Sequence, residues 1–243
     1  TCQQPSFTPL AATDKGWLVT GSKFSPSGEL VEYNDTNALY LYDPETREFS
    51  EKLYQDPNYD VGGFTGTCRN ASGGAGVDYD TRKLLYVTYE AQEPVKIYFD
   101  DEIAEIYNGL DAVFPNEWVS VVTRDKDRNK MVIRVSSPSN PGDYYFYNRE
   151  QSQLIPLYTY APWIDRKIMA ETIPVKYTAR DGLVIPAYLT LTKKKTDKNY
   201  MIVLPHGGPN TKQRIGFDWW TQFFANKGYN VLKMDFRGST GLG

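Results

Sequence analysis

The chain has 243 residues, 40% of them hydrophobic, and its 27 Lys and Arg side chains nearly balance 30 Asp and Glu, for a formal charge of −3. This length predicts two domains with enough apolar residues for a core, and the absence of a dominant basic field argues against a nucleic-acid partner. No stretch reaches the roughly 20 apolar residues of a membrane span, and no metal centre is predicted, because no cysteine lies near His206, the only histidine.

The first 160 residues predict short strands joined by turns. Residues 39–42 form a strand, Asp43–Thr46 form a turn in which proline presets φ, and residues 48–53 form the returning strand. The same order recurs over residues 144–157. Abundant aromatic residues, among them 19 tyrosines, favour strands as well.

A second pattern, a polar turn followed by an apolar strand, begins at Ser25, Asp78 and Asp125. Its interval of about 50 residues is typical of β-propeller blades with four strands each. Accidental spacing in a β-sandwich is the alternative. Since a propeller has about four to eight blades, we expect the missing ones upstream of Thr1. The sequence predicts three blades, at residues 17–60, 75–115 and 118–160.

The pattern changes near residue 162. A short helical link over residues 162–170 precedes a strand at 173–179, and Asp181-Gly182 is the dipeptide of a tight hairpin turn before a strand at 183–191. We therefore divide the chain into residues 1–165, a partial β-propeller domain, and residues 166–243, the start of an α/β-hydrolase domain.

The second domain continues with a strand, a helix and a strand. Residues 200–204 form a continuous apolar run, typical of a strand buried on both faces. A helix is predicted over residues 218–227, with Gly228 at its C-terminal end, and a strand follows at 230–236. This order predicts the beginning of an α/β sheet.

The sequence His206-Gly207-Gly208-Pro209 follows the apolar run directly. In α/β hydrolases the loop at this place contributes a backbone N–H to the oxyanion hole. Such a donor must already point at the position where the tetrahedral intermediate develops negative charge, and glycines allow the close approach of the backbone. The alternative is a turn that merely ends the strand.

Residues 173–243 resemble the first quarter of the catalytic domain of the prolyl oligopeptidase family, and most of all its acylaminoacyl peptidase and dipeptidyl aminopeptidase branch. Members of this family carry a β-propeller before that domain, in agreement with the blade pattern. The resemblance is carried by Ala179–Gly182, His206–Pro209, Ala225–Tyr229 and Asp235–Gly241.

The resemblance implies a Ser, Asp, His triad in that order, with the serine in a Gly-x-Ser-x-Gly turn. The sequence contains no such pentapeptide, and Ser72 and Ser239 are interpreted as turn serines. His206 precedes any candidate serine. We therefore expect all three triad residues after Gly243 and expect the chain alone to be inactive; a natural noncatalytic relative is the alternative.

Within this chain the resemblance assigns the oxyanion donor to the Gly208 N–H. Gly207 permits the approach of the backbone, and His206 orients the loop rather than acting as a general base. Asp235 and Arg237 are expected to fix the neighbouring loop by ion pairing.

The whole protein is expected to hydrolyse short peptides from the N-terminus by acyl transfer through a serine ester, with the propeller screening substrates by size. No cofactor is implied, a homo-oligomer remains open, and the sequence does not decide between cytoplasm and periplasm. We interpret the acidic stretch at residues 100–105 as a solvated strand edge or loop rather than as the family's amine-binding glutamates. The rival functions are an α/β-hydrolase esterase and a noncatalytic binding protein.

Overall fold

The computed structural model describes residues 7–62, 73–195, 199–208 and 211–242. Cys2, Cys68 and Ser72 lie outside the described residues. The chain forms two compact units: unit 1 comprises Thr1–Ala104, His206–Arg214 and Asp235–Gly243, and unit 2 comprises Glu105–Pro205 and Ile215–Met234. The division into domains at residue 165 stays a prediction.

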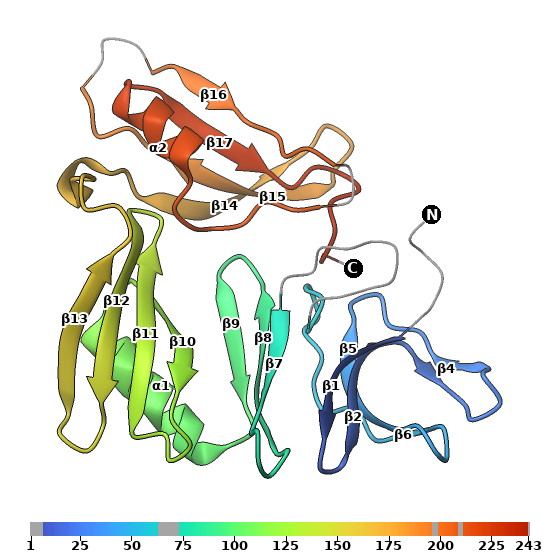
Figure 1. Cartoon of the computed structure of the whole chain (residues 1–243). Coiled ribbons are helices and arrows are strands. Elements are labelled where there is room, and N and C mark those ends of the chain that lie inside the picture. Colours follow the sequence, from blue (N-terminus) through green and yellow to red (C-terminus); the bar gives the residue numbers. More distant parts are fainter. Residues whose placement is uncertain (1–6, 63–72, 196–198, 209–210, 243) are drawn as a thin grey trace. The chain divides into compact units, whose positions relative to one another are not determined.

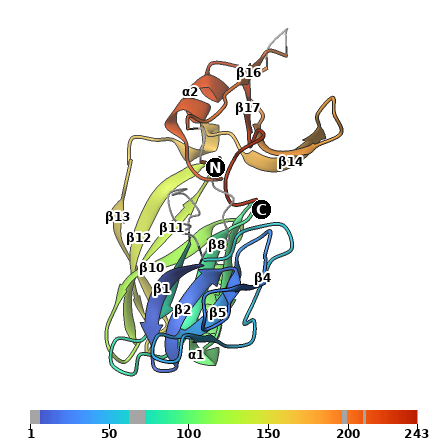
Figure 2. The ribbon, with the colours of Figure 1, turned by 90° about the vertical axis from the view of Figure 1, so that its right-hand side faces the viewer.

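The first sheet of unit 1 is an antiparallel meander of four strands in the order β1-β2-β5-β6 (Figures 1 and 2). A two-stranded hairpin of β3 and β4 is inserted between its second and third strands. The sheet begins ten residues before the predicted blade boundary at residue 17, because the strand that pairs with β2 was not predicted. The strands are β1 (Phe7–Thr13), β2 (Gly16–Gly21), β3 (Lys23–Phe24), β4 (Leu30–Glu32), β5 (Ala38–Asp43) and β6 (Glu48–Phe49).

The second sheet of unit 1 has three strands, β7 (Gly73–Val77), β8 (Leu84–Glu90) and β9 (Pro94–Tyr98), in that order. Alternate residues of β8 are buried, as expected for a strand with one face in a core. Leu18 and Leu39 of the first sheet and Val87 and Tyr89 of β8 share one hydrophobic cluster. The two sheets therefore pack face to face through these side chains.

Equivalent turns join the first two strands of two sheets. Asp78 Oδ1 accepts hydrogen bonds from the backbone N–H groups of Asp80 and Thr81, and Asp125 Oδ1 accepts from those of Asn129 and Lys130. Such side-chain bonds stabilise a turn locally. The interval between Asp78 and Asp125 thus marks corresponding places, as predicted. The turn at Ser25 was predicted to be equivalent to these two turns. That prediction was wrong, because the Ser25 turn joins β3 to β4 outside the four-stranded sheet.

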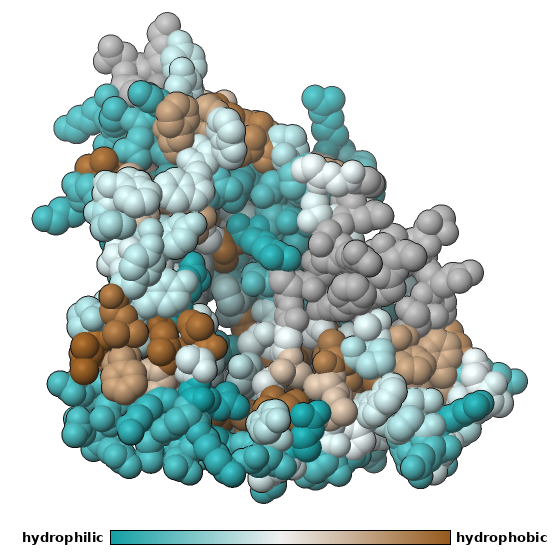
Figure 3. All heavy atoms as spheres, in the orientation of Figure 1, coloured by the Kyte–Doolittle hydropathy of each residue, from teal (hydrophilic) through white to brown (hydrophobic). Residues whose placement is uncertain are grey.

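Unit 2 contains a four-stranded antiparallel sheet in the order β10-β11-β12-β13, which agrees with the strand content predicted for residues 118–160. Figure 3 shows hydrophilic side chains at the end of this sheet where β10 turns into β11 and β12 into β13, at the lower left. Closure of a propeller stays a prediction. The strands are β10 (Trp118–Arg124), β11 (Lys130–Ser137), β12 (Asn140–Asn148) and β13 (Gln153–Thr159).

A helix, α1 (Asp101–Val113), stands where the sequence predicted the end of a four-stranded blade. The interpretation of residues 100–105 as a strand edge or loop was wrong. Asp100 Oδ1 accepts the Ile103 N–H, and the acidic residues that follow it stabilise the positive end of the helix dipole. The buried side chains recur at helical spacing; they are Ile103, Ile106, Tyr107 and Leu110.

The second sheet of unit 2 has the order β14-β15-β17-β16, and its hairpin of β14 (Thr172–Thr178) and β15 (Val184–Thr190) is seen in Figure 2. The predicted helical link is a 3₁₀ turn at Arg166–Ile168. β16 (Met201–Val203), α2 (Trp219–Asn226) and β17 (Asn230–Met234) form the predicted strand, helix and strand, and β16 pairs with β17 in parallel. Asp218 caps α2, and Gly228 follows it with φ of 96°.

The prediction that residues 200–204 are buried on both faces was wrong. Met201 is 49% exposed and Val203 is 50% exposed. Within the described part of the chain, β16 is an edge strand that pairs only with β17. Figure 3 shows apolar atoms at the top of the view, around α2 and β16. No helix among the described residues is long and apolar enough to cross a membrane.

Candidate functional site

The candidate site is built from two loops that follow neighbouring parallel strands. Residues 205–208 come after β16, and residues 235–241 come after β17. The carboxyl ends of parallel strands lie at one edge of the sheet, where open α/β sheets place their ligands. Pairing of Val203 with Leu232, extended by the hydrogen bond from Leu204 N to Leu232 O, keeps the two strands in register up to this edge.

The second loop begins with a tight turn from Phe236 to Ser239. The Ser239 N–H donates to Phe236 O over 3.0 Å, and Gly238 at the third position of the turn has φ of 89°. A type II turn requires such a positive φ at that position, which explains the glycine. The interpretation of Ser239 as a turn serine agrees with this geometry.

The imidazole of His206 lies between the two loops, and both of its nitrogens are engaged. Nε2 lies 2.8 Å from Ser239 Oγ, and Nδ1 lies 2.8 Å from Gly207 O. The ring also stacks on Phe236, with centroids 4.3 Å apart and planes 18° apart. Its side chain is only 7% exposed. Each ring nitrogen thus has a polar partner; the loop-orienting role expected of His206 stays a prediction.

Asp235 stands at the end of β17 and is buried next to the same ring. Its Oδ1 lies 3.9 Å from His206 Nε2 and accepts a 2.6 Å hydrogen bond from the Gln213 N–H. In a Ser-His-Asp triad, serine and aspartate contact opposite ring nitrogens. Here Ser239 and Asp235 both approach Nε2, so the three side chains do not form a triad. The ion-pairing role expected of Arg237 stays a prediction.

The two glycines of the first loop are exposed. Gly208 has φ of 143°, a conformation that L-residues rarely adopt, so glycine is required there by the backbone. A Cβ added to Gly207 would meet no atom within 4 Å. Both residues thus lie where a bound ligand could reach the backbone.

A buried lysine, Lys212, ties the segment after the first loop to other parts of unit 1. The Lys212 ammonium donates to Glu90 O and lies 5.8 Å from the centre of the Tyr59 ring. Burial lowers the pKa of Lys212, and the charges of Glu90, Asp235 and Asp60 oppose that effect. This role could not be predicted from the sequence, because a lysine in a polar loop is usually solvated.

The backbone adds two further connections at this place. The Thr240 N–H donates to Thr211 O over 3.0 Å, and the Asp60 N–H donates to Gly241 O over 3.2 Å. Burial raises the pKa of the Asp60 carboxyl, although the Asn37 N–H and the Lys212 charge oppose it. Segments far apart in the sequence are thereby fixed around the candidate site.

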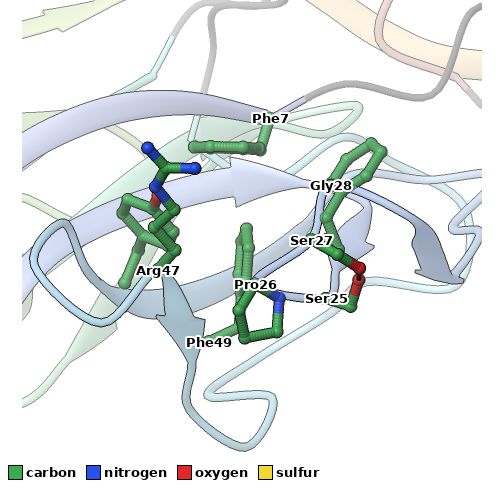
Figure 4. A pocket seen from close by; sticks show the side chains of 9 residues that line it. Phe7, Ser25, Pro26, Ser27, Gly28, Arg47 and Phe49 are labelled. Atoms are coloured by element: carbon green, nitrogen blue, oxygen red, sulfur yellow. Dashed lines mark hydrogen bonds between the residues drawn. The ribbon is translucent and has the colours of Figure 1, made fainter.

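A separate cavity of about 460 Å³ opens on the β1-β2-β5-β6 sheet. Figure 4 shows Phe7 and Phe49 on two sides of it, Arg47 at one end, and Ser25 and Ser27 at the other, joined by a 2.8 Å hydrogen bond. Four aromatic side chains, Phe7, Phe24, Tyr42 and Phe49, are part of its lining, and the described residues bring no histidine or carboxylate into it. The geometry gives this cavity no catalytic chemistry.

Comparisons with known proteins find similarity to proteins named as peptidases. The chain is 31% identical over 179 residues to dipeptidyl aminopeptidase BIII of Pseudoxanthomonas mexicana. This alignment covers 70% of the present chain and 26% of that protein. The chain is 28% identical over 184 residues to dipeptidyl peptidase family member 6 of Caenorhabditis elegans. This alignment covers 67% of the present chain and 25% of that protein. A scan against models of protein families finds no match.

The fold is similar to that of a solved acylaminoacyl peptidase of Pyrococcus horikoshii, with a TM-score of 0.56 over 98% of this chain and 34% of that one, at 18% identity. The curated relatives are named as a dipeptidyl aminopeptidase and a dipeptidyl peptidase family member. The chain belongs to the prolyl oligopeptidase family of peptidases, as its sequence motifs indicated. It spans about a quarter of the length of the curated relatives it matches.

Proposed function

We propose that this chain is part of a serine peptidase that releases short pieces from the N-terminus of peptides by acyl transfer, and that the Gly208 N–H is one of its two oxyanion donors. The observation that carries the proposal is the exposed Gly207-Gly208 segment at the carboxyl end of β16, with Gly208 at a φ of 143°. A preorganised backbone donor of this kind stabilises the charge of a tetrahedral intermediate.

The described sheets support a propeller in the same protein. Among the described residues, three antiparallel sheets of three or four strands precede the β14–β17 sheet along the chain, in addition to the β3–β4 hairpin. A ring of such sheets would admit short peptides and exclude folded proteins. The β14–β17 sheet, with its parallel pair and crossover helix, would be the start of the α/β-hydrolase domain.

The test uses the whole protein with chromogenic dipeptidyl, acylaminoacyl and simple ester substrates. We expect hydrolysis of an amide after the first residue or the first two, and labelling of one serine by a fluorophosphonate. Hydrolysis of the simple ester alone would favour the esterase. A folded protein that neither turns over nor takes up the probe would favour a binding protein.

Gly208→Val tests the oxyanion assignment in the same assays. The valine side chain blocks the approach to the donor and is strained at this φ, so kcat should fall by about 10²- to 10³-fold, as when one oxyanion donor is lost. Circular dichroism and the unfolding midpoint verify the fold of the variant. Unchanged turnover in the folded variant would refute the assignment.

A further inference from the structure

The peptide group between Gly207 and Gly208 is held from its carbonyl side. Gly207 O lies 2.8 Å from His206 Nδ1, and since a carbonyl oxygen can only accept, Nδ1 carries a proton. In a planar trans peptide the C=O and the following N–H point in opposite directions. Fixing the Gly207 carbonyl therefore fixes the direction of the Gly208 N–H.

The imidazole that makes this bond is itself held by the second loop. Ser239 Oγ meets Nε2 at 2.8 Å, and Phe236 stacks on the ring face. Oγ also lies 2.6 Å from Phe236 O, so the single hydroxyl proton is shared between this carbonyl and Nε2, and the hydroxyl is held between its own turn and the ring. Stacking keeps the plane of the ring in place, but only a polar contact fixes its rotation within that plane.

We propose that Ser239 is a positioning residue, which acts through the His206 ring to set the orientation of the Gly208 N–H. The series runs from Phe236 O through Ser239 Oγ and the imidazole to Gly207 O. The Nδ1–H bond to Gly207 O also polarises the peptide group that Gly207 and Gly208 share, which strengthens the Gly208 N–H as a donor. What that donor does rests on the proposed function, but the series itself is a property of this chain.

The proposal predicts which kinetic constant depends on Ser239. A misdirected donor still allows the substrate to bind, because the ground-state carbonyl depends little on it. The transition state loses stabilisation, because the oxyanion develops only there. Loss of the hydroxyl should therefore lower kcat and leave KM nearly unchanged.

The first experiment needs no catalytic activity. In the whole protein labelled with ¹⁵N-histidine, the ring nitrogens of His206 are assigned as the NMR signals that His206→Gln removes. With ¹³C-labelled glycine carbonyls, a coupling across the hydrogen bond from Nδ1 to Gly207 should be seen in the wild type. Ser239→Ala should weaken that coupling and shift the Gly208 amide, and Ser239→Thr should restore both.

The matched control is the neighbouring hydroxyl. Within the described residues, Thr240 Oγ1 is buried and has no hydrogen-bond partner. Thr240→Val keeps the shape of that side chain and should leave the ring nitrogens and the Gly208 amide unchanged. If Ser239→Ala does not fold, Ser239→Cys replaces it. The thiol is a weaker hydrogen-bonding group than the hydroxyl, so the Gly208 amide signal should shift by an intermediate amount.

Kinetics in the whole protein complete the test. Ser239→Ala should lower kcat by roughly ten- to a hundredfold, less than the loss of a donor outright, with KM unchanged and Ser239→Thr restoring the rate. An unprotonated Nδ1 in the wild type, or no NMR response to Ser239→Ala, overturns the inference whatever the activity. If Ser239→Ala changes the NMR signals but leaves kcat unchanged, the positioning role of Ser239 stands and the catalytic role of the Gly208 N–H is refuted.

Discussion

Gly238 and Gly109 share open surroundings but differ in backbone conformation. A Cβ at either position would meet no atom within 4 Å. Gly238 has φ of 89° in the turn that carries Ser239, whereas Gly109 lies within α1. An L-residue at positive φ costs about 1–3 kcal/mol, and alanine is favoured over glycine in a helix by about 1 kcal/mol.

We therefore expect Gly238→Ala to lower the free energy of unfolding by about 1 kcal/mol and Gly109→Ala to raise it by about 1 kcal/mol. Urea unfolding followed by circular dichroism measures both. Because the two substitutions add the same methyl group into open space, each serves as the control for the other. If both substitutions changed the free energy of unfolding equally and with the same sign, φ would not be the property that decides the change in stability.

At this scale the sequence located part of the site. His206, Gly207 and Gly208 were found because they are adjacent in sequence and form a recognisable motif together with Pro209. Ser239 and Lys212 were not assigned their contacts, since these join loops 33 and 122 residues apart along the chain. Such pairs depend on tertiary structure, which no local pattern reports.

At the scale of elements, α2 is docked within unit 2 by one buried amide. Gln222 is 3% exposed. Its Nε2 donates to Pro138 O and Ala170 O, both over 2.8 Å, and its Oε1 accepts from the Ala170 N–H over 2.9 Å. The helix is thereby tied to the β11–β12 turn and to the link that follows the 3₁₀ turn.

Gln222→Met should lower the free energy of unfolding by about 3 kcal/mol, because three buried backbone groups lose their partner and each costs about 1–3 kcal/mol. Methionine keeps the length of the side chain, so the packing volume changes little. Gln153→Met on the exposed side of β13 is the control and should change stability by less than about 0.5 kcal/mol. A loss below 1 kcal/mol for Gln222→Met would contradict the docking role.

An ion pair joins the 3₁₀ turn to β12. Arg166 donates to Asp143 Oδ1, which also accepts from Thr159 Oγ1 over 2.9 Å. Burial raises the pKa of Asp143, but the hydrogen bonds from Arg166 and Thr159 and the charge of Arg166 outweigh it and hold the pKa below 3.8. A carboxyl whose pKa is lowered by folding stabilises the fold at pH values above its pKa in the unfolded state. That contribution is lost as the pH falls through its pKa in the folded state.

Asp143→Asn should therefore lower the free energy of unfolding at pH 7 by about 2 kcal/mol, as for a hydrogen bond to a charged group. The difference from the wild type should shrink as the pH is lowered below 3.8, because the wild type then becomes protonated as well. Urea titrations at several pH values measure both effects. A difference that stays constant down to strongly acidic pH would show that the charge of Asp143 is not the cause.

The elements themselves were predictable to different degrees. Alternating strands such as β11 and the Asp-Gly hairpin of β14 and β15 follow from local periodicity and turn chemistry. The exposure of β16 could not be predicted in this way, because an apolar run indicates a strand but does not show which neighbours cover it. The start of α1 was missed because its acidic residues suit both a solvated loop and a helix N-terminus.

At the scale of the whole molecule, the single histidine limits the chemistry of this chain. Both nitrogens of His206 are engaged, and Asp235 approaches the nitrogen that Ser239 occupies. A serine becomes nucleophilic when a histidine accepts its proton and a third group orients that histidine. Ser239 Oγ also lies 2.6 Å from Phe236 O, which competes with the imidazole for the hydroxyl proton. We therefore expect this His–Ser pair to orient a loop rather than to form an activated nucleophile.

We expect the 243-residue chain to keep its mass of 27.7 kDa after treatment with a fluorophosphonate, whereas the whole protein gains one adduct on a serine outside this chain. Intact-mass spectrometry of both, with peptide mapping of any adduct, makes the comparison. Ser239→Ala in the chain is the control for labelling at that residue. One adduct on the wild-type chain that disappears in Ser239→Ala would show that Ser239 is activated, and the role of His206 would then have to be that of a base.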